Sequence, residues 1–150
     1  MLTLPIKRKW LEMIRHGEKR EEYRAISPYY TSRFKAFLPA MNINNEAAEK
    51  IFREATEKEI RVAFSNVVLR AGYSPFSPAI MVSGKITVGP GLPEWGAVKG
   101  EEYYILHIEK MEDLMTDAKS YTPEHVYSDE NADCKILQFS QKAEKNDTEG

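Results

Sequence analysis

The spacing of apolar and polar residues predicts helices near the start of the chain and strands in its middle. Apolar residues recur at helical spacing over 5–16, with a proline suited to the first helical position and Gly17 as the stop. A second apolar stripe predicts a helix over 45–58, with an asparagine at its start as the cap. Between these helices, residues 27–30 contain Ser, Pro and two tyrosines, which is typical of a loop.

The period then changes from helical to extended. Segments rich in β-branched and apolar side chains predict strands over 60–69, 79–88 and 103–108, and a further strand around 135–139. Glycine, serine and proline over 72–78 predict a loop between the first two of these strands. Short strands combined with a few helices favour an α+β domain or a small barrel.

Length and composition restrict the class of protein. A chain of 150 residues with 42% apolar and 29% charged residues is expected to form one domain with one core, which excludes disordered, collagenous and fibrous proteins. No apolar run approaches the roughly 20 residues that a membrane helix needs, and the apolar residues at the start are too few for a signal peptide. The single cysteine, Cys134, excludes an internal disulfide and a multi-cysteine zinc site. We therefore expect a cytoplasmic protein with no membrane partner, no metal and no cofactor.

The net charge of -2 conceals an asymmetry along the chain. Residues 1–100 carry 16 Lys and Arg against ten Asp and Glu, whereas residues 101–150 carry five against thirteen. A positive excess in one part of a chain can indicate an anionic partner such as RNA. A solvated acidic end that keeps the protein soluble explains the same asymmetry equally well.

Charged residues of both signs are concentrated in the segment 17–24, Gly-Glu-Lys-Arg-Glu-Glu-Tyr-Arg. The segment follows the first predicted helix and alternates as a short strand does, which places Arg20, Glu22 and Arg24 on one face. A lysine beside a carboxylate and an arginine can bind an anionic or planar polar ligand, and a buried lysine can transfer protons. The alternative is a surface cluster of ion pairs, each worth at most about 1 kcal/mol.

Two other groups of residues are given structural roles. Trp10 has helical spacing with Ile6 and Ile14, which predicts a position in the core. The histidines have neither metal-ligand spacing nor a paired nucleophile, and they are interpreted as structural or solvent-exposed: His16, His107 and His125.

The segment 17–24 has the form Gly-x-Lys-x-x-Glu-x-Arg after an amphipathic helix, and this pattern resembles the signature of the ASCH family. The likeness continues, in the expected order, through Val-Leu-Arg-Ala-Gly-Tyr at 68–73, Ser-Pro-Ala-Ile-Met-Val at 77–82, Gly-Leu-Pro-Glu-Trp-Gly-Ala at 91–97 and Glu-Tyr-Tyr-Ile-Leu-His-Ile at 102–108. The resemblance therefore rests on several ordered blocks rather than on the signature alone.

The resemblance implies an α+β fold, a small PUA-like β-barrel flanked by helices, over residues 1–117. Within it, the helical stretch of about 30–58 is expected to be an insertion. Residues 118–139 are expected to form a C-terminal extension, and 140–150 a disordered tail.

The resemblance also implies a cleft beside the signature that binds RNA, a nucleoside or a nucleotide. Basic residues there can contact phosphates, and aromatic residues can stack on bases, an interaction worth about 1–3 kcal/mol per base. For an arginine and a tyrosine after the strand at 60–69, surface and packing roles are equally good explanations. The ligand-binding candidates are Lys9, Lys19, Glu22, Arg24, Arg70, Tyr73 and Trp95.

A hydrolase is the alternative to a binding domain. Small ASCH proteins that act as amidohydrolases on N4-acetylcytidine have a similar signature and use a lysine, a threonine and a glutamate. Lys19 stands at the lysine position, but Glu22 replaces the threonine, and a carboxylate there favours the protonated lysine and weighs against this activity. Glu94 is the only acidic residue between 61 and 100, so it is the candidate for the glutamate.

The catalytic candidates are thus Lys19, Glu22 and Glu94, for a hydrolase acting on a modified nucleoside or on RNA. A third class, a domain that binds a small non-nucleic ligand or a protein, also stays open. The acidic C-terminal part suits a basic partner, but its pattern specifies none.

Overall fold

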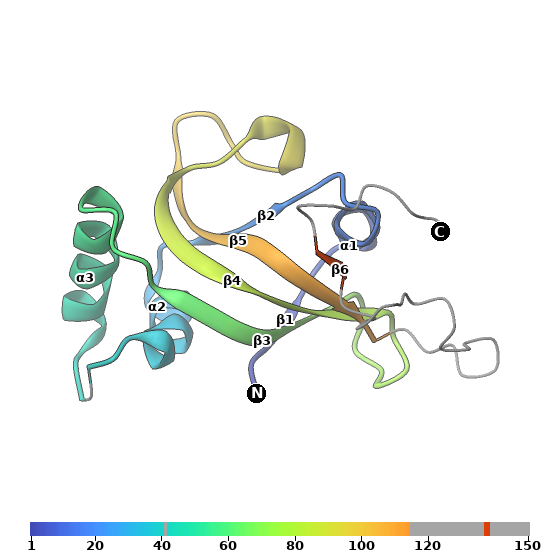
Figure 1. The fold of residues 1–150 in the computed structure, drawn as a ribbon, viewed down its shortest axis with the longest axis horizontal. Helices are drawn as coiled ribbons and strands as arrows, with labels where there is room; N and C mark the ends of the chain where they lie inside the picture. Colours follow the sequence, from blue (N-terminus) through green and yellow to red (C-terminus); the bar gives the residue numbers. More distant parts are fainter. Residues whose placement is uncertain (41, 115–136, 139–150) are drawn as a thin grey trace. The chain divides into compact units, whose positions relative to one another are not determined.

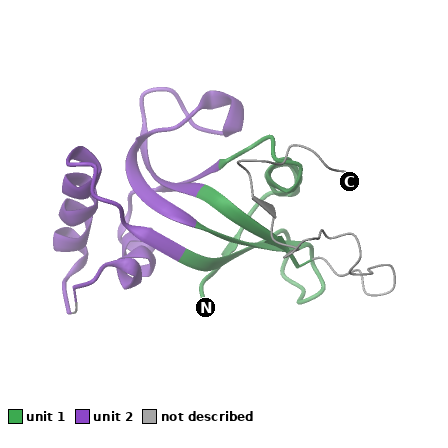
Figure 2. Cartoon of the chain, viewed as in Figure 1, with its two compact units in different colours: residues 1–20, 65–83, 108–150 green, residues 21–64, 84–107 purple. Residues whose placement is uncertain are grey.

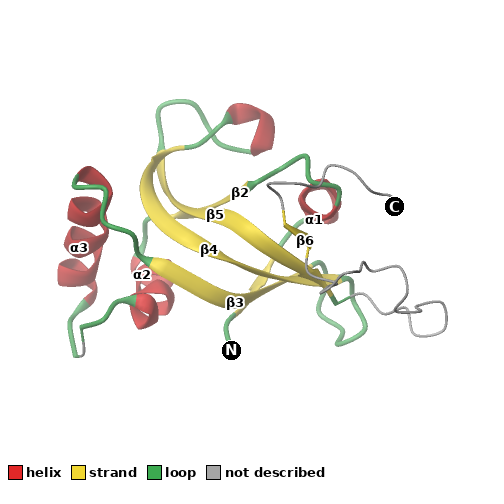
Figure 3. Cartoon of the chain, in the orientation of Figure 1, coloured by secondary structure: helices red, strands yellow, loops and turns green. Residues whose placement is uncertain are grey.

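The computed structural model describes residues 1–40, 42–114 and 137–138, and it has the expected α+β class (Figures 1 and 3). The strands are hydrogen-bonded in the order β1-β3-β4-β5-β2, and β6 pairs with β5. In chain order the elements are β1 (Thr3–Pro5), α1 (Arg8–Arg15), β2 (Glu21–Ala25), α2 (Pro28–Phe34), η1 (Lys35–Phe37), α3 (Asn45–Glu57), β3 (Ala63–Arg70), β4 (Ala79–Pro90), η2 (Pro93–Trp95), β5 (Glu102–Asp113) and β6 (Leu137–Gln138).

The chain forms two compact units, which are coloured separately in Figure 2. Unit 1 comprises residues 1–20, 65–83 and 108–150, and unit 2 comprises residues 21–64 and 84–107. β3, β4 and β5 each begin in one unit and end in the other. Unit 1 therefore contains β1 and α1, whereas unit 2 contains β2, α2 and α3.

Unit 1 is organised by the pairing of β1 with β3. The two strands run parallel, with Leu4 opposite Leu69 and Pro5 opposite Arg70. The N–H of Ile6 continues this ladder to the carbonyl of Arg70 at 3.0 Å. The core of unit 1 is formed by buried apolar side chains from both strands and their neighbours: Leu4, Ile6, Leu11, Ile14, Val67, Val68, Leu69, Ala79, Ile80, Val82, Ile108 and Met111.

The helix predicted over 5–16 begins later than expected, because Pro5 is the last residue of β1 and α1 begins at Arg8. Leu4 and Ile6 are buried, and the residues on either side of each are not. The period here is therefore that of a strand. Proline is tolerated because β1 lies at the edge of the sheet, where it need not donate to a second neighbour.

In unit 2, the segment 27–30 is not the predicted loop but the start of α2. The Ser27 side chain accepts a hydrogen bond from the N–H of Tyr30, and a proline occupies the first helical position. A side-chain cap also confirms the predicted start of α3, where the Asn44 side chain accepts a hydrogen bond from the N–H of Ala47 at 2.7 Å. Ser27 and Pro28 therefore mark the start of a helix rather than a turn.

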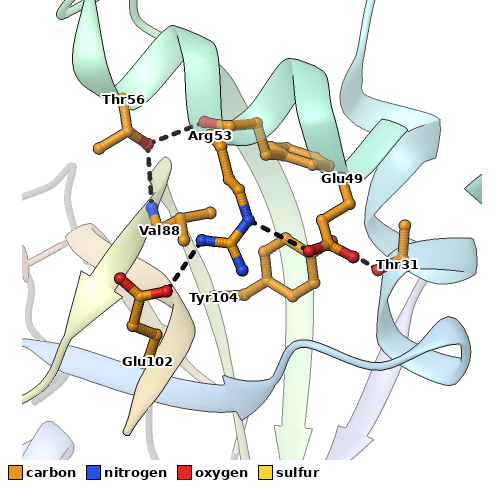
Figure 4. Close-up of polar contacts among 8 residues, drawn as sticks. Thr31, Glu49, Arg53, Thr56, Val88, Glu102 and Tyr104 are labelled. Carbon is orange, nitrogen blue, oxygen red and sulfur yellow. Dashed lines mark hydrogen bonds and ion pairs between the residues drawn. The ribbon is translucent and has the colours of Figure 1, made fainter. Parts of the chain in front are cut away.

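α3 packs against the strands of unit 2 through apolar and polar contacts (Figure 4). Phe52 meets Tyr104 edge-on, with ring centroids 5.3 Å apart. Thr56 Oγ1 donates to the carbonyl of Phe52 and accepts from the N–H of Val88, both at 2.9 Å. The helical stretch 30–58 therefore contributes to the core of unit 2.

β3 and β4 coincide closely with predicted strands, and β5 extends beyond its predicted end at 108 as far as Asp113. β6 lies inside the strand predicted around 135–139 and runs antiparallel to β5. The rest of the expected C-terminal extension and the expected tail over 140–150 lie outside the described residues. In the described part of the chain, no helix has the length and apolar character needed to cross a lipid bilayer.

We predict that Thr56→Val destabilises the protein by about 1–3 kcal/mol, because the N–H of Val88 loses its partner while the side-chain shape is kept. Urea unfolding, followed by circular dichroism, measures the change. Thr3→Val, at an exposed position in β1, is the matched control and should stay within about 0.5 kcal/mol of the wild type. Equal effects of the two substitutions would contradict the role given to Thr56.

Candidate functional site

The charged side chains of the signature segment are buried. Exposed fractions are 1% for Lys19, 6% for Glu22 and 7% for Arg24. The chain turns from α1 into β2 at Gly17, whose φ of 80° favours glycine, and the N–H groups of Glu18 and Lys19 both bond to the carbonyl of Met13. The interpretation of the segment as a surface ion-pair cluster is therefore wrong for these three side chains.

Lys19 belongs to unit 1, where its side chain lies over an aromatic ring. Its Nζ is 5.4 Å from the centroid of Trp10, and the Nζ of Lys9 is 4.5 Å from the same centroid. Trp10 is only half-buried, so its predicted position in the core is wrong. The Trp10 ring instead forms cation–π contacts with the ammonium groups of Lys9 and Lys19.

Glu22 and Arg24 belong to unit 2 and face the same side of β2. Arg24 Nη2 donates to Glu22 Oε2 at 2.6 Å, and Arg24 Nε lies 3.2 Å from the same oxygen. The guanidinium also lies 5.7 Å from the ring centroid of Tyr30. Burying such a pair costs several kcal/mol of desolvation per ion, and the close contact offsets that cost only while both partners are present.

The predicted site residues are divided between the two units. Unit 1 contains Lys9, Lys19, Arg70 and Tyr73, and unit 2 contains Glu22, Arg24, Glu94 and Trp95. In unit 1 the structure brings Arg70 and Tyr73 to one loop. In unit 2 Glu94 is exposed and Trp95 is half-buried, both in η2.

Arg70 shapes the loop that follows β3. Its Nη1 donates to the carbonyl oxygens of Pro75 and Ser77, each at 3.1 Å. The N–H of Phe76 bonds to Ser74 Oγ at 3.0 Å, and the N–H of Ser74 bonds to Ser77 Oγ at 3.2 Å. The loop is therefore closed by its own hydrogen bonds, and Arg70 positions it.

The loop presents its aromatic side chains to solvent. Tyr73 is fully exposed, so the alternative of a packed tyrosine is wrong, and Phe76 is 93% exposed. Gly72 allows the close turn between β3 and these two aromatic residues. Its φ of 143° favours glycine, and a Cβ at this position would overlap Ser77 Oγ.

A hollow of about 360 Å³ opens beside this loop and is lined by Pro5, Ile6, Lys7, Gly72 and Tyr73. We call the exposed side chains of Lys7 and Tyr73, together with this hollow, the Lys7–Tyr73 surface. Within the described residues, the Lys7 side chain has neither a hydrogen bond nor an ion pair.

The electrostatic surroundings of Lys7 are positive. Lys7 precedes the first residue of α1 without capping it, and the first turn of the helix contains no acidic residue. Arg8 and Lys9 follow, so three consecutive cations stand where the helix dipole is positive, which destabilises the helix, and of the three only Arg8 has a carboxylate partner among the described residues, Glu12 at 3.5 Å. A charge arrangement that costs stability in the free protein becomes favourable when an anion binds.

Sequence reasoning missed a polar chain in unit 2. Thr87 Oγ1 lies 2.7 Å from His107 Nε2, and Glu21 Oε2 lies 3.7 Å from His107 Nδ1. The Thr87 hydroxyl and His107 Nε2 share one hydrogen bond, and the imidazole tautomer decides which of the two donates. The 3.7 Å between Glu21 Oε2 and Nδ1 is too long for a hydrogen bond. His107 therefore has a hydroxyl partner after all, on the strand β4.

Glu21 is also held from its other side. The Tyr23 hydroxyl donates to Glu21 at 2.7 Å and accepts from the N–H of Leu92 at 2.9 Å. Burial raises the pKa of Tyr23 well above its usual range, and the hydrogen bond to Glu21 raises it further. Tyr23 thus stays protonated at neutral pH and ties β2 to the connection between β4 and β5.

Among the described residues, no group of three or more His, Cys, Asp and Glu side chains is arranged to hold a metal ion. Comparison of the chain with models of protein families, with curated proteins and with solved structures found no match.

We predict that Arg24→Met destabilises the protein by about 3 kcal/mol, because the buried Glu22 carboxylate loses the guanidinium that lies 2.6 Å from it. Arg53→Met is the matched control. Arg53 also contacts two carboxylates, Glu49 and Glu102, but its side chain is 42% exposed, so we expect a loss of at most about 1 kcal/mol. Denaturant unfolding compares the two variants, and equal losses would show that burial does not set the strength of these pairs.

Proposed function

We propose that this chain is an RNA- or nucleotide-binding domain of the ASCH kind, with a PUA-like fold, and that it binds its ligand on the Lys7–Tyr73 surface. The observation that carries the proposal is a fully exposed tyrosine and an exposed lysine lining one hollow. The Gly-x-Lys-x-x-Glu-x-Arg pattern and the blocks that follow it support the assignment to this kind of domain.

The charge of this part of the chain suits a phosphate-bearing ligand. Residues 1–20 and 65–83 together contain seven Lys and Arg and two Asp and Glu. Lys7, Arg8 and Lys9 are all exposed. Each phosphate that a lysine or arginine neutralises releases condensed counterions, so binding weakens as the salt concentration rises.

The shape of the surface suits a base or nucleoside. A volume of about 360 Å³ lies within the range of small-molecule sites, roughly 300–1,000 Å³. Tyr73 offers an aromatic face, and stacking of a base on such a face is worth about 1–3 kcal/mol. A nucleotide would use both side chains of the hollow, with its base stacked on Tyr73 and its phosphate held by Lys7.

A second candidate function is hydrolysis of a modified nucleoside. Lys19, Glu22 and Glu94 remain its predicted catalytic residues, although Lys19 is 1% exposed and a substrate must displace neighbouring side chains to reach it. The specific observation in favour of a hydrolase is the Thr87 hydroxyl, which lies 2.7 Å from His107 Nε2, with Glu21 Oε2 3.7 Å from the other ring nitrogen.

We predict that Lys7→Asp weakens binding to a fluorescein-labelled 12-nucleotide single-stranded RNA while it stabilises the free protein. The aspartate caps α1, which is worth about 0.5–2 kcal/mol, and it also removes a cation from the hollow. For three phosphate contacts, raising the salt from 50 to 200 mM should weaken wild-type binding roughly 10-fold to 20-fold. Fluorescence anisotropy measures binding, and urea unfolding measures stability.

Lys50→Asp is the control for Lys7→Asp, since it makes the same charge change at an exposed position of α3. We expect it to leave the affinity within about twofold, because Lys50 does not line the hollow. Wild-type affinity that does not change with salt, or equal effects of the two substitutions, would reject the proposed surface.

The hydrolase candidate predicts slow release of acetate from N4-acetylcytidine at high protein concentration. Lys19→Met should abolish turnover if the signature lysine is catalytic. Thr87→Val should abolish turnover if the Thr87 hydroxyl attacks the acetyl group. Liquid chromatography of the nucleoside separates substrate from cytidine. No turnover by the wild-type protein would sink this candidate and leave the binding proposal intact.

A further inference from the structure

We propose that the ligand of the Lys7–Tyr73 surface is a single strand of at least two nucleotides, with one base stacked on Tyr73 and another on Phe76. This inference rests on the proposed function and decides between the two ligand classes that it leaves open, an oligonucleotide and a mononucleotide. It also excludes duplexes as preferred ligands.

The first observation is that two fully exposed aromatic rings stand in one short loop. Among the described residues, the large apolar side chains that are at least 90% exposed are Met1, Tyr73 and Phe76. Single exposed apolar residues are common on protein surfaces and need no explanation. Two aromatic residues separated by two positions in the same loop form a local feature, and Phe76 has no hydroxyl that water would solvate.

The second observation is that the loop is held in this exposed conformation. Arg70 bonds to the carbonyls of Pro75 and Ser77, and the N–H of Ala71 bonds to the carbonyl of Pro78 at 2.8 Å. A loop without these bonds could fold its rings onto the protein. Because the backbone around Phe76 is already ordered, a ligand that stacks there loses less conformational entropy on binding.

The third observation concerns charge. Residues 71–78 contain no charged side chain, and the charged residues nearest in sequence and in the hollow are Arg70 and Lys7. An apolar protein partner would use the two rings but would gain nothing from the exposed cation. A ligand with planar apolar faces joined by anions uses both, and single-stranded nucleic acid has this composition.

The hollow explains why one nucleotide is not sufficient. Tyr73 lines it, whereas Phe76 does not, so a mononucleotide in the hollow leaves the second ring unused. A strand that continues out of the hollow carries its next base past the loop. Paired bases present only their edges, so a duplex offers neither ring a face on which to stack.

Stacking and phosphate contacts do not read the sugar or the base edges. We therefore expect RNA and DNA single strands of the same length to bind with similar affinity, and with little sequence preference. This expectation distinguishes the surface from a site that recognises one modified nucleoside.

The test compares adenosine monophosphate, a dinucleotide, a 12-nucleotide single strand and a 12-base-pair duplex, each bound to the full chain and measured by anisotropy or competition. Phe76→Ala should weaken binding of the 12-nucleotide strand roughly 5-fold to 150-fold, the loss of one stacked base, and leave the monophosphate unchanged. Tyr73→Ala should weaken both. Phe76→Trp should restore binding of the strand.

Tyr29→Ala is the control, because Tyr29 is also an exposed aromatic residue, at 53%, but lies on α2 in unit 2. Phe76 is exposed, so its substitution should not change the urea midpoint. If Phe76→Ala leaves the strand affinity unchanged while Tyr73→Ala weakens it, the two-base inference fails and the proposed function stands. If the wild-type protein binds no nucleic acid, both fail.

A lipid surface is the competing partner for exposed aromatic and basic residues. Vesicles of phosphatidylserine and phosphatidylcholine therefore form a separate arm of the experiment. Binding to these vesicles that Phe76→Ala abolishes, with no binding to the single strand, would overturn the inference in favour of a membrane. Similar affinities for the duplex and the single strand would also overturn it.

Discussion

The parallel pairing of β1 with β3 is the constraint on which the candidate site depends. Because parallel strands end at the same edge, the residues that follow each of them come together. Pro5 stands opposite Arg70, so Lys7 after one strand and Tyr73 after the other line a single hollow. Arg70 then fixes the shape of the loop by binding two of its carbonyls. An antiparallel pairing would have placed these two side chains at opposite ends of the strands.

The charged side chains of the signature are buried, so they are not the residues that a ligand meets first. Lys19, Glu22 and Arg24 are at most 7% exposed, and a ligand cannot reach them without displacing their neighbours. Their desolvation is costly, and a close partner is needed to offset it, as the pair of Glu22 and Arg24 illustrates. These signature side chains therefore take part in packing and pairing within the chain rather than in a direct ligand contact. In our proposal the exposed residues around the hollow provide the contacts instead.

Local chemistry explains which elements the sequence could predict. The apolar stripe and the asparagine cap predicted α3, because both signals lie within the helix itself. Ile6 also fits a helical spacing with Trp10, and only the non-local partner β3 settles the strand period of Leu4 and Ile6. The Ser-Pro pair at the start of α2 is compatible with a turn and with a helix start, and tertiary packing decides between them.

The same distinction applies to the candidate site. Tyr73 could be proposed from its loop composition, but the importance of Lys7 depends on the pairing of two strands more than 60 residues apart in sequence. The chain of Thr87, His107 and Glu21 joins β4, β5 and β2, so no local spacing reveals it. Photocrosslinking of a 4-thiouridine single strand, followed by tryptic mass spectrometry, locates the bound strand on the chain. If the strand stacks on the loop after β3, crosslinks form at Tyr73 or Phe76 in the peptide 71–85, whereas crosslinks confined to other peptides would contradict this binding site.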